Sequence, residues 1–409
     1  MEMLSTAMIA TRWTLSVRRF VGTGGVSDLA YAAGRFFRRV AMSLAVTTAL
    51  SVGAVSASSA SAVPAASTPG WRITQVSGTQ FEGISPLNGH DAWLVGSDSG
   101  SLYLETWNGS TWRPAKQPAG LDVNVYQASV DAVSPADVWL FPAVSKSTGN
   151  VEYAMYWNGH KWATKFTLGS TVDLLSDAIF GPSNVWLFGQ KLGTPGPSGW
   201  GQPYAEHYDG STWRQSSLPI DVLMVSKISA SDVWAVGPSA KSTAFLAVRW
   251  TGKAWTKPLT VASPAKVNGD GWSVTSSFAQ SPTSLWVLER LNVTNRGTGQ
   301  EPPGSAILHW NGHKWSVITE NLSYYLYRAE PDGNGGFWVP GSKTESSPAV
   351  FAHYSGGRWT YQPVPTKSGY TAGVANLELI PGTHSLWAVG VLNPVKNGLT
   401  EFAILKYGP

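Results

Sequence analysis

The sequence predicts an all-β fold, a seven-bladed β-propeller with four antiparallel strands in each blade. The first observation is a tryptophan that recurs every 46 to 52 residues, usually two residues after Asp, Asn or Ser. Repeats of this length are typical of units that cannot bury both faces alone and therefore stack around an axis. The second observation is the composition, because 21 Trp and 43 Gly with only 13% charged residues disfavour a helical bundle or a disordered tail. The repeated tryptophans are Trp93, Trp139, Trp186, Trp234, Trp286, Trp338 and Trp387.

Each repeat is expected to contain four short strands, here called A to D, and the second repeat shows the pattern clearly. Strand A is predicted at Tyr126 to Ser134, strand B at Val138 to Ala143, strand C at Glu152 to Trp157 and strand D at Lys161 to Phe166. Asn158-Gly159 predicts a two-residue hairpin between C and D, because both turn positions of that hairpin favour positive φ. The Asp that stands two residues before several of the repeated Trp predicts a side-chain-to-backbone turn between A and B.

The seventh repeat ends at Tyr407-Gly408 and has no strand D of its own. The segment Trp71 to Val76 resembles the Trp-initiated strand D of the other repeats but has no A, B or C strand before it. We therefore expect Trp71 to Val76 to complete the last blade and to close the ring, which removes its open edges. Eighteen of the 21 Trp fall on repeat positions and are expected to be core; the exceptions are Trp13, Trp200 and Trp272.

The first 62 residues differ in character from the remainder and predict a signal peptide with a long basic region. Three arginines precede the apolar, small-residue stretch Val40 to Val55, and Ala60-Ser-Ala62 has the small-x-small pattern of a cleavage site. The apolar stretch is too short to span a bilayer, and the alternative is a short core helix. Residues 63–70 are then a linker and residues 71–409 the propeller, so we expect a secreted, extracellular protein cleaved near Ala62.

Charge and cysteine content exclude several classes of function. The formal charge is +4, but six of the 29 basic and two of the 25 acidic residues lie in residues 1–62, which leaves 23 of each. A neutral mature chain predicts no nucleic-acid binding. No second long apolar run follows, so we expect no membrane anchor. The absence of Cys excludes disulfides, thiolate metal sites and cysteine nucleophiles.

The segment Asp232 to Gly237, followed by an Arg-Trp-x-Gly-x-x-Trp motif, resembles the Trp-rich repeats of secreted bacterial propellers in the kelch-like, galactose-oxidase-type superfamily. The resemblance covers residues 71–409 and implies the fold, but not an activity. Copper oxidases of that superfamily use a tyrosine cross-linked to cysteine, which a chain without Cys cannot form. Tyr208 to Trp213 is similar to the Asp-box of sialidases, but it is one residue shorter between Asp and Trp.

Ligand-binding residues are expected where the loops differ between repeats, at the B-C loops and D-A connections. Two off-pattern tryptophans lie in such loops, Trp200 and Trp272, together with Tyr204 and Asp270. Exposed aromatic rings with a few polar groups suit sugar rings or apolar ligands, whereas the alternative is that these rings only cover the core.

A second set of candidates comes from the expected mouth of the central channel, 13 residues before each repeated Trp. The carboxylates Asp173 and Asp221 fall there on neighbouring blades, and Tyr126 and Tyr325 fall there on two others. Two nearby carboxylates could hold a cation or act as acid and base in glycoside hydrolysis, and the alternative is a pair of solvated turn residues. The full set is Gln80, Tyr126, Asp173, Asp221, Ser273, Tyr325 and Val374.

Histidine predicts no metal centre. His207, His309 and His353 share one repeat position, before the aromatic residue of strand C; equivalent residues lie about one blade apart around the rim, and only His309 and His353 are on adjacent blades. Metal ligands must lie about 2 Å from the ion, which this spacing does not allow. We expect no cofactor, although a structural cation in the channel stays open.

These observations favour a monomeric, secreted, non-enzymatic binding propeller that holds a glycan or another extracellular protein on the face of the B-C loops and D-A connections. The first alternative is a carbohydrate-active hydrolase or lyase with Asp173 and Asp221 in its site. The second alternative is a structural component of the cell envelope.

Overall fold

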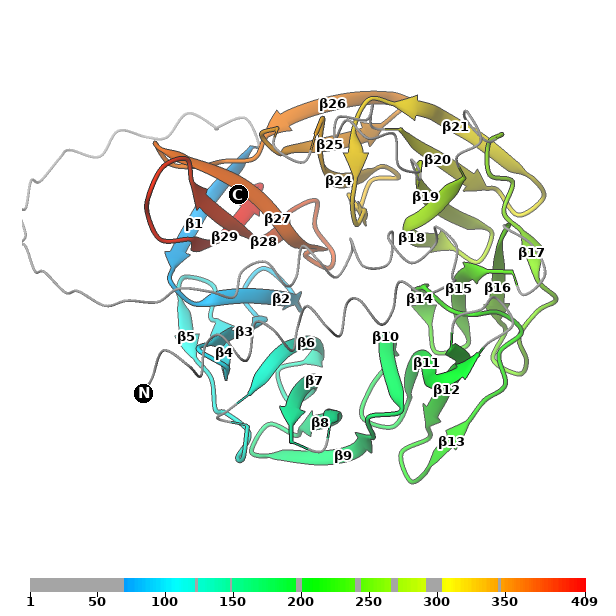
Figure 1. The fold of residues 1–409 in the computed structure, drawn as a ribbon, viewed down its shortest axis with the longest axis horizontal. Coiled ribbons are helices and arrows are strands. Elements are labelled where there is room, and N and C mark those ends of the chain that lie inside the picture. The colour runs from blue at the N-terminus through cyan, green and yellow to red at the C-terminus, as the bar shows by residue number, and fades with distance from the viewer. Residues whose placement is uncertain are drawn as a thin grey trace, which may run out of the picture. The chain divides into compact units, whose positions relative to one another are not determined.

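The computed structural model describes residues 70–121, 124–147, 149–195, 201–239, 244–265, 271–291, 304–344 and 347–409. Within these residues all regular structure is β, and the strands form seven antiparallel sheets arranged as blades around an axis. In Figure 1 the first strand of a blade lies innermost, as the labelled strands β2, β6, β10, β14 and β18 show. The predicted seven-bladed β-propeller is therefore confirmed.

The strands of the first six blades follow in chain order from the axis outward. Blade 1 has β2 (Gln80–Pro86), β3 (Ala92–Asp98), β4 (Ser101–Trp107) and β5 (Trp112–Pro114). Blade 2 has β6 (Val125–Ser134), β7 (Asp137–Lys146), β8 (Gly149–Trp157) and β9 (Trp162–Leu168). Blade 3 has β10 (Val172–Ile179), β11 (Val185–Pro195), β12 (Gly201–Tyr208) and β13 (Trp213–Gln215). Blade 4 has β14 (Met224–Ser229), β15 (Asp232–Pro238), β16 (Phe245–Trp250) and β17 (Leu259–Thr260). Blade 5 has β18 (Trp272–Ser281), β19 (Ser284–Leu291), β20 (Ser305–Trp310) and β21 (Trp315–Leu322). Blade 6 has β22 (Tyr325–Leu326), β23 (Glu330–Pro331), β24 (Phe337–Ser342), β25 (Val350–Ser355) and β26 (Arg358–Pro363), and both β22 and β23 pair with β24.

The seventh blade joins the two ends of the propeller. It contains β27 (Tyr370–Leu379), β28 (Leu386–Pro394) and β29 (Glu401–Tyr407), and its outer strand is β1 (Trp71–Ser77). Trp71 pairs with Tyr407, and its ring stacks on Phe351 of the sixth blade at a centroid distance of 3.7 Å. The predicted closure by the N-terminal strand is confirmed, and the ring contact ties the closing strand to a neighbouring blade as well.

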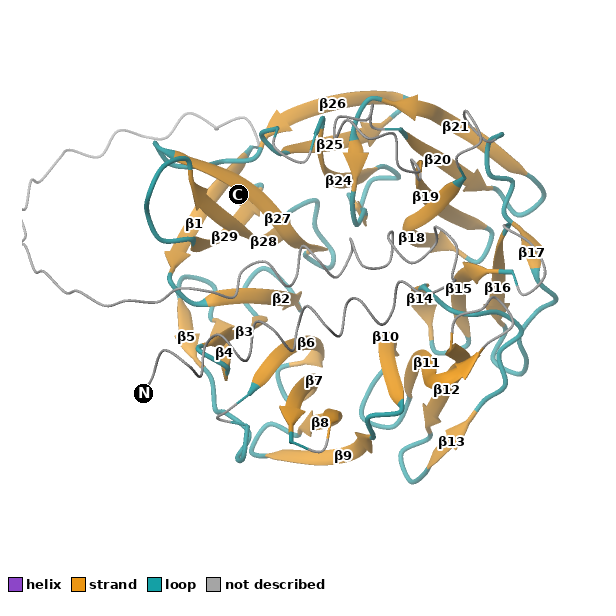
Figure 2. Cartoon of the chain, viewed as in Figure 1, coloured by secondary structure: helices purple, strands orange, loops and turns teal. Residues whose placement is uncertain are grey.

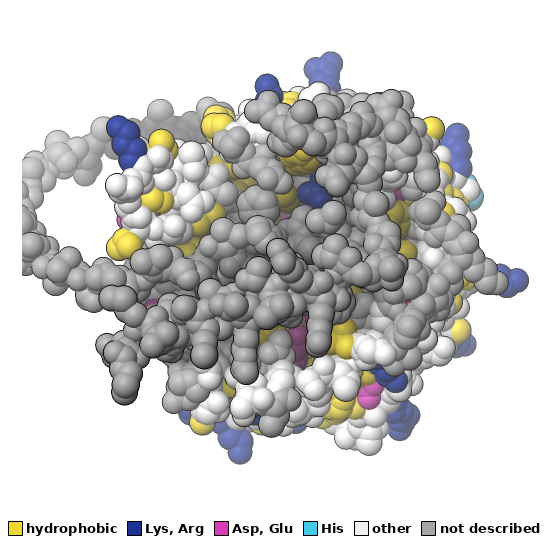
Figure 3. All heavy atoms as spheres, viewed as in Figure 1, with side chains coloured by type: hydrophobic (Ala, Val, Ile, Leu, Met, Phe, Trp, Pro, Cys, Tyr) yellow, Lys and Arg dark blue, Asp and Glu magenta, His cyan; other side chains and the backbone are white. Residues whose placement is uncertain are grey.

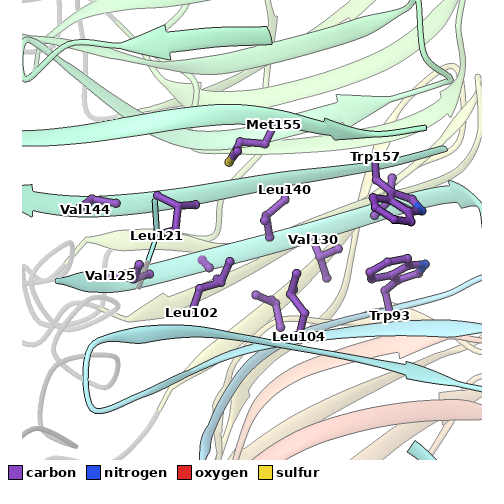
Figure 4. Packing of buried hydrophobic residues seen from close by; sticks show 13 residues of the cluster. Trp93, Leu102, Leu104, Leu121, Val125, Val130, Leu140, Val144, Met155 and Trp157 are labelled. Atoms are coloured by element: carbon purple, nitrogen blue, oxygen red, sulfur yellow. The ribbon is translucent and has the colours of Figure 1, made fainter. Parts of the chain in front are cut away.

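Apolar clusters between adjacent blades form the core. In Figure 4, Trp93 and Leu104 of blade 1 lie against Leu140 and Trp157 of blade 2. The rings of Trp93 and Trp157 are 6.2 Å apart, which is within the range of favourable edge-to-face contact. The Nε1 group of Trp162, at the start of strand D, donates to the backbone oxygen of Lys116 in the preceding blade at 2.7 Å. The repeated tryptophans therefore pack and hydrogen-bond between neighbouring blades.

The inner strands carry bulges that require small residues opposite them. A Cβ on Gly237 of β15 would lie 1.5 Å from the carbonyl oxygen of Asp221, which is backbone and cannot give way. Glycine is found three residues after the repeated Trp in five blades, whereas blade 5 has Glu289 at that position. Glu289 has no solvent exposure, and its Oε1 accepts a hydrogen bond of 2.6 Å from Ser263.

The C-D hairpins differ from the sequence prediction in their geometry. Only the glycine of the Asn-Gly pair has positive φ, as at Gly109 with φ of 91°, and Asn108 does not. Instead, Oδ1 of Asn108 accepts the backbone N–H groups of Ser110 and Thr111. The prediction of positive φ at both turn positions was wrong because the Asn side chain already satisfies the turn.

Candidate functional site

The ring has two faces with different content. The A-B turns and C-D hairpins share one face, here called the turn face, and the B-C loops and D-A connections share the other, here called the loop face. Backbone hydrogen bonds join the two kinds of loop on the loop face, as between Ser145 and Asn124 at 2.9 Å and between Val395 and Gly369 at 2.8 Å. These bonds show that the B-C loops and the D-A connections lie on the same face of the ring.

The turn face consists of a repeated structural motif. Each of His207, His309 and His353 stacks on the repeated Trp of its own blade, with ring centroids 4.1 to 4.2 Å apart. The Nε2 atoms of the same rings are hydrogen-bonded to side chains at the A-B corner, 2.8 Å from Oδ2 of Asp332 in the case of His353. Burial lowers the pKa of His207 and His309, which favours their neutral form. These histidines therefore stabilise the blade.

Blade 4 uses a different pair of side chains at the same position. Arg249 replaces the histidine, and its guanidinium donates to both carboxylate oxygens of Asp232 at 2.7 Å each. A two-point bond of this kind fixes geometry better than a single contact. The sequence predicted that the Asp before the repeated Trp bonds the turn backbone. In this blade, Asp232 accepts hydrogen bonds from the side chain of Arg249 on strand C.

The predicted carboxylates Asp173 and Asp221 lie at the boundary of blades 3 and 4. Both are 8% exposed, and Oδ2 of Asp173 accepts a hydrogen bond from Nε2 of Gln190 at 3.3 Å. Asp221 and Gln190 line a cavity of about 10 Å³, which is close to the space of one water molecule. A sugar ring does not fit in this cavity.

Two of the predicted aromatic contacts are packing residues. Trp272 is 7% exposed and packs in the core cluster with Trp234, and Tyr204 is 6% exposed. Burial, together with a hydrogen bond to Glu206, raises the pKa of Tyr204. Trp200 and Asp270 lie outside the described residues.

The remaining predicted aromatics, Tyr126 and Tyr325, are half-buried at the loop-face ends of β6 and β22. Tyr325 is covered by a cation, because the guanidinium carbon of Arg290 lies 5.8 Å from its ring centroid. This is within the range of attraction between a cation and an aromatic ring.

The same pairing of tyrosine and cation recurs on the loop face of other blades. The amino group of Lys146 lies 5.3 Å from the centroid of the Tyr153 ring in blade 2, and that of Lys367 lies 4.0 Å from Tyr370 in blade 7. Lys367 also pairs with Glu401. The fourth pair is Lys343 with Tyr324, at 5.8 Å.

Sequence reasoning missed three of these four tyrosines. A signal existed for Tyr370, which begins strand A of its blade just as Tyr325 does. Counting back a fixed 13 residues from Trp387 reached Val374 instead, because β27 starts four residues earlier than that rule assumes.

A group of charged side chains lies in the channel. It is nearer to the turn face than Asp173 and Asp221, the carboxylates that the sequence predicted at the channel mouth. We call it the channel cluster. Lys227 of blade 4 forms an ion pair with Asp131 of blade 2, and Nη2 of Arg328 lies 3.2 Å from Oε1 of Glu378 in the next blade. The full cluster is Asp131, Asp177, Lys227, Arg328, Glu330 and Glu378.

Burial is the main influence on the acids of the channel cluster. It raises the pKa of Asp177, and the neighbouring charge of Asp131 raises it further while Lys227 opposes the shift. Burial followed by the charge of Glu378 raises the pKa of Glu330, whose Oε1 accepts the backbone N–H of Leu379 at 3.3 Å. Carboxyl groups with raised pKa values near cations can take part in proton transfer or regulate binding.

The described residues contain no group of three or more His, Asp or Glu side chains placed to hold a metal ion. In the same part of the chain, no helix has the length and hydrophobicity needed to cross a bilayer.

Comparison with known proteins supports the fold. No protein-family model matches the sequence, and no curated protein matches it. The chain is similar in structure to YCF48 bound to D1 peptide, with 12% sequence identity and a TM-score of 0.52 over 85% of this chain and all of that one. It is also similar to an ulvan lyase bound to a saccharide of GlcA and Rha3S, with 10% identity and a TM-score of 0.53 over 80% of this chain and 95% of that one. A catalytically inactive virginiamycin B lyase from Staphylococcus aureus with quinupristin has 11% identity and a TM-score of 0.51, over 83% and 98% of the two chains. The structural similarity supports the propeller fold, and at identities this low it says nothing of the activity.

Proposed function

We propose that the protein is a secreted binding propeller that holds a glycan or an extracellular protein on its loop face. One observation carries the proposal: the two faces of the ring are built differently. The turn face repeats the same histidine stacks and hairpin caps, which are used up in holding the blades together. The loop face has loops of different sequence, and four of its tyrosines lie beside cations. Variable loops on a rigid scaffold are where binding residues gather.

The propellers compared above act on or bind different molecules, and this supports a binding role without naming the ligand. YCF48 was solved with a peptide, and the ulvan lyase with a saccharide. Membership of the kelch-like superfamily is part of the same proposal and rests on the Asp232 to Gly237 motif.

The binding proposal is tested with the purified full chain on a glycan array and by capture from a cell-wall extract. We expect one class of ligand to bind, and Tyr153→Ala with Tyr370→Ala to weaken that binding at least tenfold. Lys253→Ala, on a C-D hairpin of the turn face, is the matched control and should leave binding within twofold. Ligand binding that resists the tyrosine changes would overturn the assignment to the loop face, and binding to nothing would overturn the function.

Export is the second part of the proposal and rests on residues 1–62, which lie outside the described residues. The mass of the protein recovered from the culture medium should correspond to a chain that begins near Val63. Recovery of the uncleaved chain from the cell alone would overturn this part.

A second candidate function is a carbohydrate-active hydrolase or lyase, and the channel cluster favours it. Asp177 and Glu330 have raised pKa values and lie near Lys227 and Arg328, a combination that suits acid–base chemistry. The test is turnover of a polysaccharide panel by the full chain and by Asp177→Asn with Glu330→Gln. Product release that the double variant abolishes would support the enzyme, and no release by the unaltered protein would exclude it for that panel.

A further inference from the structure

Acidic and basic residues are distributed differently between the interior and the surface of the propeller. None of the Lys and Arg side chains in the described residues is fully buried. Seven acidic residues are less than a tenth exposed, and four more belong to the channel cluster. The buried acidic residues are Glu105, Asp173, Glu206, Asp221, Asp232, Glu289 and Asp332.

This distribution changes what the charge balance means. The sequence has equal numbers of acidic and basic residues after position 62, which predicted a neutral surface. Seven acids are buried in the blades, whereas no described Lys or Arg is, and the channel cluster holds two cations beside its four acids. The accessible charges of the described propeller therefore have an excess of positive sign. In Figure 3, Lys and Arg side chains project at several points around the outline, and acidic side chains are visible at fewer places.

The loop face shows the excess clearly. Its described cations come from five of the seven blades. Of the described acids near the loop ends, Asp173, Asp221 and Glu289 are buried, Glu401 already pairs with Lys367, and Asp98 is exposed. Three of the four cations next to tyrosines are lysines, so each presents N–H donors beside an aromatic ring. The loop-face cations are Lys146, Lys191, Arg290, Lys343, Lys367 and Lys396.

We propose that the loop face binds an anionic polysaccharide, carrying carboxylate or sulfate groups along its chain. This inference rests on the proposed binding function and names its ligand class. A polymer is favoured over a small anion because the cations are spread over blades 2, 3, 5, 6 and 7 and do not converge on one point. Lysines bind the acidic groups, and the neighbouring tyrosine rings contact the apolar faces of the sugars.

The spacing of the cations also separates a glycan from a nucleic acid. Duplex DNA has about one charge per 1.7 Å of axis and demands dense clusters of cations. The described loop face has about one cation per blade, which is too sparse for the dense phosphate charge of a duplex and suits a polymer with fewer charges along its chain.

The test measures binding of the purified full chain to polygalacturonate and dextran sulfate, each beside its uncharged counterpart, methyl-esterified polygalacturonate and dextran. We expect binding to at least one charged polymer, no binding to its uncharged form, and at least tenfold weaker binding at 200 mM than at 50 mM NaCl, because ion release drives the association. The triple variant Lys146→Gln, Lys343→Gln and Lys396→Gln should lose at least tenfold in affinity.

A matched triple variant on the turn face, Lys161→Gln, Lys253→Gln and Lys314→Gln, removes the same charge from hairpin tips and should stay within twofold. Equal losses for the two triple variants would overturn the inference, because binding would then follow net charge alone. Binding only to a neutral glycan or a protein would overturn the ligand class and leave the binding function intact, whereas no binding to any ligand would overturn both. Tighter binding to single-stranded DNA than to either charged polysaccharide would replace the glycan with a nucleic acid.

Discussion

Lys227 of the fourth blade forms an ion pair with Asp131 of the second blade, so the two residues join blades that are not neighbours in the ring. The blade between them contributes Asp177, whose pKa is influenced by both charges. An interaction of this kind acts across the channel and adds to the packing between adjacent blades.

Replacement of Lys227 by Met should lower the free energy of unfolding by about 1 kcal/mol. The effect is modest because the lysine and aspartate side chains are 45% and 18% exposed and water screens the pair. It is unfavourable because Asp131 and Asp177 are then left close together without their cation. Urea unfolding at neutral pH measures the change, and Lys253→Met on an exposed hairpin is the control. Equal stabilities of the two variants would show that the ion pair contributes nothing.

The substitution Gly237→Ala adds only one methyl group but should strongly lower the free energy of unfolding. The added Cβ would meet the carbonyl oxygen of Asp221 at 1.5 Å and its carbonyl carbon at 2.7 Å, so the chain at Asp221, just before β14, has to move. We expect a loss of about 3 kcal/mol, typical of overpacking against backbone. Gly78→Ala is the matched control because nothing lies within 4 Å of its Cβ. Thermal or urea unfolding of the two variants compares them directly, and a loss at Gly237 no larger than at Gly78 would contradict the clash.

The blade pattern could be predicted because it is periodic. The repeated Trp fixes where strand B begins, and the Trp of strand D fixes the outer edge, so even the separated Trp71 segment could be assigned to the last blade. Each of these positions has one role in every repeat. One sequence is therefore enough to predict the strands, because the same packing requirement recurs in each blade.

The channel cluster could not be predicted by the same reasoning, because its members occupy different repeat positions. Asp131 pairs with Trp139 in the strand ladder, whereas Lys227 pairs with Val233, the residue before the repeated Trp. Bulges at different points of the inner strands shift the register, so a fixed count from the Trp falls on different faces of different blades. Asp221 shows the result: it lies 13 residues before Trp234, at the expected channel mouth, but the inner strand β14 begins only at Met224.

Glu289 should make the stability of the propeller depend on pH. Burial raises its pKa from 4.5 to about 7, although the hydrogen bond from Ser263 opposes the shift. Because the folded state holds the proton more tightly than the unfolded state, stability is highest below pH 4.5, falls as the pH rises to about 7, and is constant above that. The difference corresponds to about 3 kcal/mol.

The variant Glu289→Gln isolates this effect, because other acids of the ring also have raised pKa values. Chemical unfolding between pH 5 and pH 8.5 measures the free energy of unfolding of Glu289→Gln and of the unaltered protein. The difference between them, in favour of Glu289→Gln, should grow with pH and level off above about 7. Ser263→Ala removes the hydrogen bond that favours the ionised form, so it should raise the pKa of Glu289 further and extend the fall in stability to higher pH. A constant difference between Glu289→Gln and the unaltered protein at every pH would show that Glu289 does not titrate in this range.

Trp71→Ala tests how far the closing strand holds the ring together. The indole is 9% exposed, stacks on Phe351 and lies edge-on to Trp338 at 5.8 Å, so its removal leaves a cavity between the sixth and seventh blades. Loss of a buried Trp costs about 3 to 5 kcal/mol. When β1 detaches, β29 becomes an unpaired edge strand, which invites pairing between molecules. We therefore expect a lower unfolding midpoint together with light scattering that increases with protein concentration. Val76→Ala, on the same strand but 42% exposed, should change neither quantity. A destabilised but fully monomeric Trp71→Ala variant would show that the strand stays paired without its tryptophan, and that the backbone bonds to β29 are sufficient to close the ring.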